Sequence, residues 1–349
     1  MSGPAGITFR PFDPAHHFPD AAALIRDVNA HDSEPWLPTA DNLAHDWAPT
    51  SGFEPGRDTV LAFDGDRLVG ATIVGWRERT GTIVHNMEVW VRPADRRRGI
   101  GTALLRWAEQ HAVDSVPAGF GGSPALPHVH NGGTDRDHDA ANAFAVEMGY
   151  LPIRFGFVMQ RDLAEPIPDV PLPDGIEVRP VLEADHRRIW DADVEAFKDH
   201  WESAVREESD YRRFFDEPDL DTSLWQVAWA GDEVAGSVLN SIYADENRAL
   251  GIEAGWLQHV STRRAYRGRG VAAALIARSL VALRGRGMAV ARLGVDGANP
   301  TGAVGLYKRH GFTEFRGWIV MRKPFPTGVG VAPRPDALPE GFRAPETAA

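Results

Sequence analysis

The chain has 349 residues, a length that predicts about two domains, since a typical domain holds about 100–200 residues. Hydrophobic residues make up 43% and charged residues 25%, as in ordinary globular proteins. The lack of cysteine excludes disulfides, thiolate metal sites and a cysteine nucleophile. A net charge of −12 argues against a nucleic-acid partner, and no apolar stretch approaches the roughly 18 residues that cross a bilayer. We therefore expect a cytoplasmic protein without a membrane partner, whose charge suits a small amine substrate.

Four short segments recur in the same order in the two halves of the chain. Residues 7–11, 65–70, 96–101 and 148–150 resemble residues 176–180, 231–236, 267–272 and 310–312. Chance similarity among Gly- and Arg-rich segments is the alternative, but four ordered matches favour two copies of one fold.

A proline-rich stretch separates the two copies. Residues 164–175 contain four prolines, a composition typical of an extended linker. We therefore expect an N-terminal domain at 1–163, a linker at 164–175 and a C-terminal domain at 176–325. Residues 326–349 are rich in Pro, Gly and Ala, which predicts a poorly ordered tail.

Hydrophobic periodicity predicts the same order of elements in both copies. In the first copy we expect strands at 59–63, 68–76 and 83–91, helices at 99–111 and 140–148, and a strand at 155–160. In the second we expect strands at 223–230, 233–243 and 256–262, a helix at 270–285, a strand at 289–295, a helix at 301–310 and a strand at 318–321. This order predicts a mixed α/β fold around a central sheet.

In both copies a predicted strand runs into a Gly- and Arg-rich turn that opens a helix. The turns consist of Arg96, Arg97, Arg98, Gly99, Ile100 and Gly101, and of Arg267, Gly268, Arg269, Gly270, Val271 and Ala272. Glycine lets the backbone approach a ligand, and unpaired N–H groups at a helix N-terminus favour an anion such as a pyrophosphate. Arg96 or Arg267 would add a charged donor at the mouth. Neither turn fits a dinucleotide fingerprint or a nucleoside-triphosphate loop.

Two segments of the second copy carry a family resemblance. Residues 260–272 read VSTRRAYRGRGVA and residues 299–312 read NPTGAVGLYKRHGF. Both resemble the GCN5-related N-acetyltransferase (GNAT) family, and a weaker resemblance covers the first copy. It implies two tandem folds, each a mixed, mostly antiparallel sheet splayed between its fourth and fifth strands and flanked by helices. It also implies that acetyl-CoA lies in the split and that its acetyl group passes directly to the primary amine of a small molecule.

The resemblance assigns roles within the second copy. It implies that backbone groups of Val260 and Thr262 pair with the pantetheine arm, and that Asn299 and Tyr307 lie near the sulfur. Tyr307 would be the acid that protonates the departing thiolate, whereas its alternative role is helix packing. In the first copy, Val89 and Val91 match the pantetheine positions.

The base that deprotonates the amine is left open between Glu253 and His259. Side chains alternate along a strand, so Trp256 and Gln258 should share one face while His259 lies on the other. A bulge would change this phase. A structural hydrogen-bonding role is the alternative for either candidate.

The first copy departs from the family pattern. Ala145 stands where the second copy has Tyr307, and Glu88 aligns with His259. We therefore expect a catalytically degenerate first domain that binds CoA without turnover or serves as a scaffold. A non-catalytic acyl-CoA sensor or partner-binding module is the alternative function for the whole chain, which would act as a monomer or homodimer.

Two further features bear on substrate and metal. The tandem arrangement resembles the mycothiol synthase-like acetyltransferases, although Trp256 stands where mycothiol synthase has a glutamate. Histidines and aspartates crowd a predicted loop before the last helix of the first copy, namely His128, His130, Asp135, Asp137, His138 and Asp139. Their spacing matches no standard zinc site, so we expect no metal.

Overall fold

A computed structural model describes residues 3–116, 120–217, 220–299 and 302–326. The chain forms two compact units, Met1–Arg154 with Ile319–Ala349 (unit 1) and Phe155–Trp318 (unit 2). The predicted tail at 326–349 lies almost wholly outside the described residues. No helix within the described ranges is long and apolar enough to cross a membrane.

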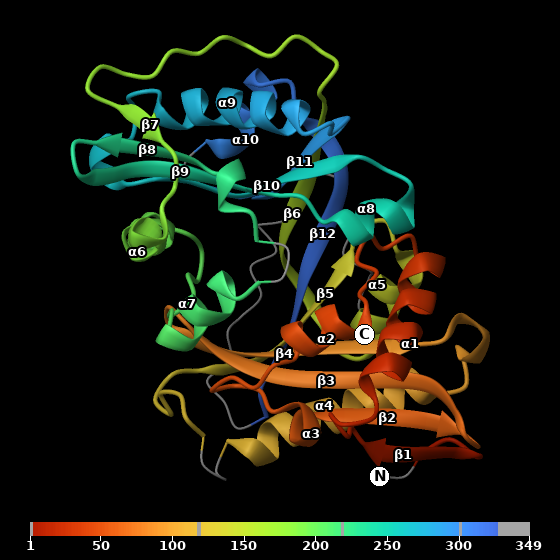
Figure 1. Cartoon of the computed structure of the whole chain (residues 1–349). Coiled ribbons are helices and arrows are strands. Elements are labelled where there is room, and N and C mark those ends of the chain that lie inside the picture. Colours follow the sequence, from red (N-terminus) through yellow and green to blue (C-terminus); the bar gives the residue numbers. More distant parts are fainter. Residues whose placement is uncertain (1–2, 117–119, 218–219, 300–301, 327–349) are drawn as a thin grey trace. The chain divides into compact units, whose positions relative to one another are not determined.

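The first repeat follows the predicted order of elements (Figure 1). Its elements are β1 (Ile7–Pro11), α1 (Phe18–His31), α2 (Ala40–Asp46), α3 (Pro55–Asp58), β2 (Thr59–Asp64), β3 (Arg67–Arg79), β4 (Thr82–Val91), the 3-10 turn η1 (Pro93–Asp95), α4 (Ile100–Ser115), β5 (His128–Asp135), α5 (Asp139–Glu147) and β6 (Leu151–Asp162).

The second repeat has the same order of strands, with helix α8 added between β9 and β10, the 3-10 turn η2 added before α6, and the 3-10 turn η3 in place of α3. Its elements are β7 (Glu177–Arg179), η2 (Glu183–Asp185), α6 (His186–Phe197), α7 (Glu208–Phe215), η3 (Thr222–Leu224), β8 (Gln226–Ala230), β9 (Glu233–Ser241), α8 (Ala244–Leu250), β10 (Ala254–Thr262), η4 (Arg264–Tyr266), α9 (Val271–Gly285), β11 (Val290–Asp296), α10 (Ala303–Arg309) and β12 (Thr313–Pro324).

The last strand of each repeat joins the sheet formed by the other repeat. β6 pairs antiparallel with β11, from Gly156↔Asp296 to Asp162↔Val290. The strand order is β1-β2-β3-β4-β5-β12 in unit 1 and β6-β11-β10-β9-β8-β7 in unit 2. The compact units therefore differ at these strands from the boundaries expected at residues 163 and 176. Local sequence pattern could not show this exchange, because strand pairing is a long-range property.

Helices cover both faces of the sheet in each unit, because side chains alternate along the strands. In β2, Leu61 packs on the α1 side while Val60 and Ala62 pack on the α4 side. In β8, Val227 packs with α6 and Ala228 packs with α9. Figure 1 shows α9 and α10 together on one face of the β8–β10 strands and α6 on the opposite face.

Both sheets open between their fourth and fifth strands, as predicted. β4 pairs in parallel with β5 only from Ile83↔His128 to Asn86↔Asn131, although β4 continues to Val91. β10 pairs with β11 only from Ala254↔Val290 to Trp256↔Arg292, although β10 continues to Thr262. Beyond these pairs the facing backbone edges diverge and leave a split in each unit.

Two local predictions were wrong. The predicted loop at residues 128–135 is strand β5. Parallel pairing with β4 draws residues 128–131 into the sheet, and Gly132 and Gly133 continue the strand, which has β12 as its other neighbour. The strand predicted to begin at residue 223 begins at Gln226, after η3. Asp221 accepts a hydrogen bond from the Ser223 N–H and thereby starts the 3-10 turn instead.

Candidate functional site

The two Gly-rich turns have nearly the same backbone conformation. Gly99 and Gly270 lie in the left-handed region at φ 81° and 89°, directly before α4 and α9. Arg97 and Gly268 are also left-handed, at φ 64° and 73°. No side chain caps either helix, so the N–H groups of each first turn remain available to an anion. A Cβ added at Gly270 would meet nothing within 4 Å, so the turn is open.

The arginine that opens each turn is held by the protein itself. Both Nη atoms of Arg96 donate to the carboxylate of Asp32, at 2.8 and 2.6 Å. One Nη of Arg267 donates to Asp199 at 2.6 Å and the other donates to the Ala196 carbonyl at 3.0 Å. The expectation of charged donors at the mouth is thus corrected for these two side chains, because they anchor the turn to the preceding helix. Backbone N–H groups remain to receive a pyrophosphate.

The predicted pantetheine positions lie along the open edges of the two splits. Val260 and Thr262 follow the last β10–β11 pair, and Val89 and Val91 follow the last β4–β5 pair. On this side their backbone pairs with no strand among the described residues. The residues present therefore fit the extended arm of an acyl-CoA along each split.

A β-bulge decides which way the candidate base points. The register between β10 and β9 shifts at Gln258, so that Trp256 lies opposite Ser241 and His259 lies opposite Leu239. Residues two apart share a face, so Ser241 and Leu239 point the same way, and so do Trp256 and His259. The regular alternation that we expected for these residues is wrong, because the bulge inserts one residue and turns His259 to the α6 face.

On that face, His259 meets a buried carboxylate of α6. Its Nδ1 lies 2.8 Å from Oδ2 of Asp193, which is only 5% exposed. Phe197 and Phe214 flank the imidazole, with ring centroids at 5.4 and 5.9 Å. The carboxylate fixes the proton on Nδ1, while Nε2 hydrogen bonds to nothing in the described part of the chain. This is the arrangement of a histidine base oriented by an acid.

Tyr307 lies on the other side of the sheet, in the core that α9 covers. It is 6% exposed, and burial raises the pKa of its hydroxyl to about 12. The hydroxyl therefore stays protonated at neutral pH and can donate. The Phe312 N–H donates to the Tyr307 carbonyl at 3.1 Å, and the Tyr150 N–H donates to the Ala145 carbonyl at 2.9 Å. Ala145 is thus the structural counterpart of Tyr307, and it has no hydroxyl.

Three other predicted residues have the following places in the fold. Glu253 is exposed just before β10, about 20 Å of extended strand away from His259. Asn299 lies in the turn after β11, where its N–H donates to the Asp296 carbonyl at 3.1 Å, next to residues 300–301 outside the described part. Glu88, the counterpart of His259, is exposed on β4, whose register with β3 has no bulge.

Comparison with known proteins gives the family. The acetyltransferase (GNAT) family model matches residues 21–150 and 187–312, which is most of both repeats. The chain belongs to the GNAT family. The two matched segments agree with the duplication inferred from the repeated motifs.

Individual relatives agree with a tandem GNAT N-acetyltransferase. A mycothiol acetyltransferase of Salinispora tropica is 33% identical over 232 residues, which cover 66% of this chain and 70% of that protein. That of Salinispora arenicola is 32% identical over 260 residues, which cover 74% and 78%. A GCN5-related N-acetyltransferase from Sphaerobacter thermophilus has a TM-score of 0.70 at 26% identity and covers 95% of this chain and 99% of its own. A tandem GNAT protein from the clavulanic acid biosynthesis pathway shares the fold, with a TM-score of 0.67 at 18% identity and coverage of 93% and 100%.

Asp193 is a residue of this acetyltransferase that sequence analysis missed. It lies on the buried face of α6 with Ile189, Ala192 and Ala196, at helical spacing. A carboxylate on the apolar stripe of a helix was the available signal, because a buried charge needs a partner. Its other oxygen, Oδ1, is enclosed and has no hydrogen-bond partner among the described residues.

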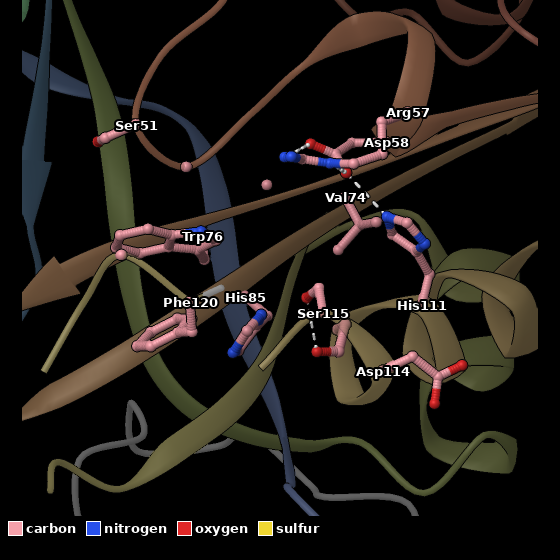
Figure 2. A pocket seen from close by; sticks show the side chains of 14 residues that line it. Ser51, Arg57, Asp58, Val74, Trp76, His85, His111, Asp114, Ser115 and Phe120 are labelled. Atoms are coloured by element: carbon pink, nitrogen blue, oxygen red, sulfur yellow. Dashed lines mark hydrogen bonds and ion pairs between the residues drawn. The ribbon is translucent and has the colours of Figure 1, made fainter. Parts of the chain in front are cut away.

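Unit 1 of the acetyltransferase holds a separate cavity of about 300 Å³ at the C-terminal end of α4 (Figure 2). The rings of Trp76 and Phe120 form one wall, with centroids 4.7 Å apart. Opposite them, His111 Nε2 lies 2.8 Å from the Asp58 carboxylate, and His85 lies deep inside. The turn before Gly99 is at the other end of α4, so this cavity is distinct from the split.

The histidines of β5 belong to the core of unit 1. His128 Nδ1 lies 2.9 Å from His85 Nε2, and His130 packs on Phe325 at 4.7 Å between ring centroids. Asp135 ends the strand, and Asp137, His138 and Asp139 follow it at the start of α5. Across the described ranges, no three His, Asp or Glu side chains are placed to hold a metal ion.

Proposed function

We propose that acyl transfer takes place in unit 2, from acetyl-CoA to the primary amine of a small molecule. Family membership supports the donor, and the split beside an uncapped α9 fits its shape. The observation that carries the proposal is the bulge at Gln258, which turns His259 onto Asp193. In the described part of unit 1, β4 has no such bulge and Glu88 forms no such pair.

Two proton transfers are needed, and they are assigned to His259 and Tyr307 on opposite sides of the sheet. An alkylammonium of pKa about 10.4 must lose a proton before its nitrogen can attack, and Nε2 of His259 accepts that proton. Asp193 stabilises the resulting imidazolium. The bound cosubstrate supplies the activated thioester, whose C–S bond breaks as the C–N bond forms. Tyr307 donates its hydroxyl proton to the leaving thiolate, which becomes a thiol of pKa about 8.5, and the second proton that the nitrogen loses as the amide forms returns Tyr307 to its neutral state.

Unit 1 is proposed to bind a CoA molecule without turnover or to act as a scaffold. It keeps the left-handed turn at Gly99 and the split beyond Asn86, which supports binding. It lacks a hydroxyl at Ala145, which removes the acid. Native mass spectrometry with acetyl-CoA separates the two roles, because two bound molecules indicate binding in both units and one indicates a scaffold.

The proposal is tested by thiol release from acetyl-CoA with a panel of primary amines. The panel should include the amine substrate of the mycothiol acetyltransferases, because two of these relatives are 33% and 32% identical. His259→Gln should lower kcat/KM by about 10²–10⁴-fold with the best acceptor, as expected for loss of a general base. Glu88→Gln, the matched change in unit 1, should leave it unchanged.

Two outcomes would overturn this proposal. Equal losses in the two variants would remove the assignment of transfer to unit 2. Tight acetyl-CoA binding without thiol release from any amine would instead favour a non-catalytic acyl-CoA sensor.

A further inference from the structure

A buried arginine of β11 forms no hydrogen bond or ion pair with a carboxylate in the described part of the chain. Arg292 is 7% exposed, and its Nε donates to Oε1 of Gln160 at 2.9 Å. Its guanidinium carbon lies 4.7 Å from the ring centroid of Phe315. Neither Nη group hydrogen bonds to a described residue, and neither is fully enclosed. Two adjacent donors of a planar cation thus face accessible space.

This state is unusual for an arginine removed from water. A buried charge is costly unless it is paired or hydrogen-bonded, and burial lowers the pKa of Arg292. The guanidinium of Arg161, which is 4% exposed in the same unit, instead donates to the main-chain carbonyls of His310 and Pro166. The fork of Arg292 is left without an equivalent partner, as expected of a group that pairs with a ligand.

Arg292 lies on the same face of the sheet as the base. It pairs with Trp256 in the last parallel contact before the split, and directly paired residues share a face. Trp256 and His259 also share a face, across Ser241 and Leu239. Ser241 and Leu239 are two positions apart, so Arg292 and His259 lie about 7 Å apart along the strands.

The cosubstrate's pyrophosphate does not suit Arg292. The phosphate-binding turn follows Thr262, about 20 Å along β10 from Trp256. The ligand that reaches both Arg292 and His259 is therefore the acceptor.

We propose that the acceptor carries a carboxylate that binds the guanidinium fork of Arg292 while its amine faces His259. Guanidinium and carboxylate match as two parallel hydrogen bonds. A dianionic phosphate is disfavoured, because Asp193 is on this face and the Glu246 carboxyl interacts with Arg292. This inference rests on the proposed function and gives its substrate class, an amino acid or a short amino-acid conjugate.

Matched acceptors test the inference. Thiol release from acetyl-CoA is measured with amino acids and with the corresponding amino-acid amides, which lack the anion. The free acids should have kcat/KM values about 10- to 100-fold higher, the scale of one lost charged hydrogen-bond pair. Arg292→Gln should abolish this preference mainly by raising KM for the acid, and Arg292→Lys should restore part of it.

Arg278→Gln is the matched control, because Arg278 is exposed on α9 at the other face of the sheet. Acetyl-CoA binding measured by calorimetry should be unchanged in every variant, which verifies that unit 2 is folded. Equal rates with acids and amides, or a preference that survives Arg292→Gln, would overturn the inference while leaving acyl transfer intact. The inference would also be overturned if no amine that carries a carboxylate is acetylated. Acetylation of an amine without a carboxylate would then show that only the substrate class was wrong.

Discussion

The two units share a fold, a left-handed turn and a split sheet, but they differ by one residue in the strand that borders the split. In unit 1, β4 pairs with β3 in unbroken register from Gly70↔Val91 to Arg79↔Thr82. In unit 2, Gln258 is an extra residue in β10, and it turns His259 onto Asp193. A single inserted residue therefore brings His259, the proposed base, onto Asp193 in one copy of the fold, whereas the other copy has an exposed Glu88.

The two units also differ in how α4 and α9 pack on the sheet. His85 of β4 matches Gly255 of β10 once the bulge is allowed for, and Ala112 matches Leu283 in the helices that cover them. A Cβ on Gly255 would lie 2.6 Å from Leu283, so glycine lets this leucine pack directly on the strand. In unit 1 the larger histidine and smaller alanine leave a cavity of about 300 Å³. At this position unit 2 thus packs a leucine directly on the strand, whereas unit 1 has a cavity.

After the loss expected for His259→Gln, the largest effect that separates the units concerns Tyr307, the proposed acid. Tyr307→Phe should lower kcat by about 10²-fold, because the leaving thiolate loses its proton donor, while the affinity for acetyl-CoA is kept. Steady-state thiol release and calorimetry measure the two quantities. The ring and its contact with Phe312 remain, so a change in folding is not expected. Unchanged turnover would show that Tyr307 only packs the core, as Ala145 does in unit 1.

The next effect concerns the positioning residue, which unit 1 lacks. Asp193→Asn should lower kcat by about 10- to 100-fold without changing acetyl-CoA binding, because the imidazole of His259 loses its orientation. Asp193→Glu should recover part of the activity if the carboxylate itself matters. Losses that are equal in the two variants and accompanied by a lower free energy of unfolding would indicate a structural role instead.

A smaller predicted effect is a pH dependence of stability that arises from the core of unit 1. Burial lowers the pKa of His85 to about 3 and that of His130 to about 4, from 6.5. The unfolded chain therefore binds more protons as the pH falls below 6.5, so stability that is complete above this pH is lost as the pH falls toward 4. His85→Phe should reduce this slope by about 1.4 kcal/mol per pH unit. Urea unfolding at pH 6.5 and 4.5 measures it, and a parallel pH dependence in variant and wild type would contradict it.

The smallest effect compares the two phosphate-binding turns. Gly268→Ala should destabilise unit 2 by about 1–2 kcal/mol, because alanine is strained at φ 73°. Arg97→Ala at the matching position of unit 1 should stay within about 0.5 kcal/mol, since a non-glycine side chain already occupies φ 64° there. Free energies of unfolding in urea give both values. Equal losses of unfolding free energy in Gly268→Ala and Arg97→Ala would contradict this prediction, because a non-glycine residue would then cost the same at both positions.

Local sequence pattern was sufficient to predict elements whose apolar residues recur at regular spacing. The helix predicted at 270–285 is α9 at Val271–Gly285, because its apolar residues recur at helical spacing and glycine opens it. Strand β5 was missed because two histidines and two glycines give it no strand-like pattern. Its extended form depends on β4 beside it and on burial of His128 and His130.

The sequence by itself determined the duplicated fold, the two Gly-rich turns before α4 and α9, and the contrast between Tyr307 and Ala145. These depend on residue type and spacing within short segments, which fix backbone conformation and available side-chain chemistry. Only the tertiary structure decided that Arg96 and Arg267 anchor their turns, that each repeat gives its last strand to the other sheet, and that His259 meets Asp193. Those features depend on strand pairing, register and side-chain burial between distant residues, and one bulge in β10 reverses the face that strand alternation alone predicts.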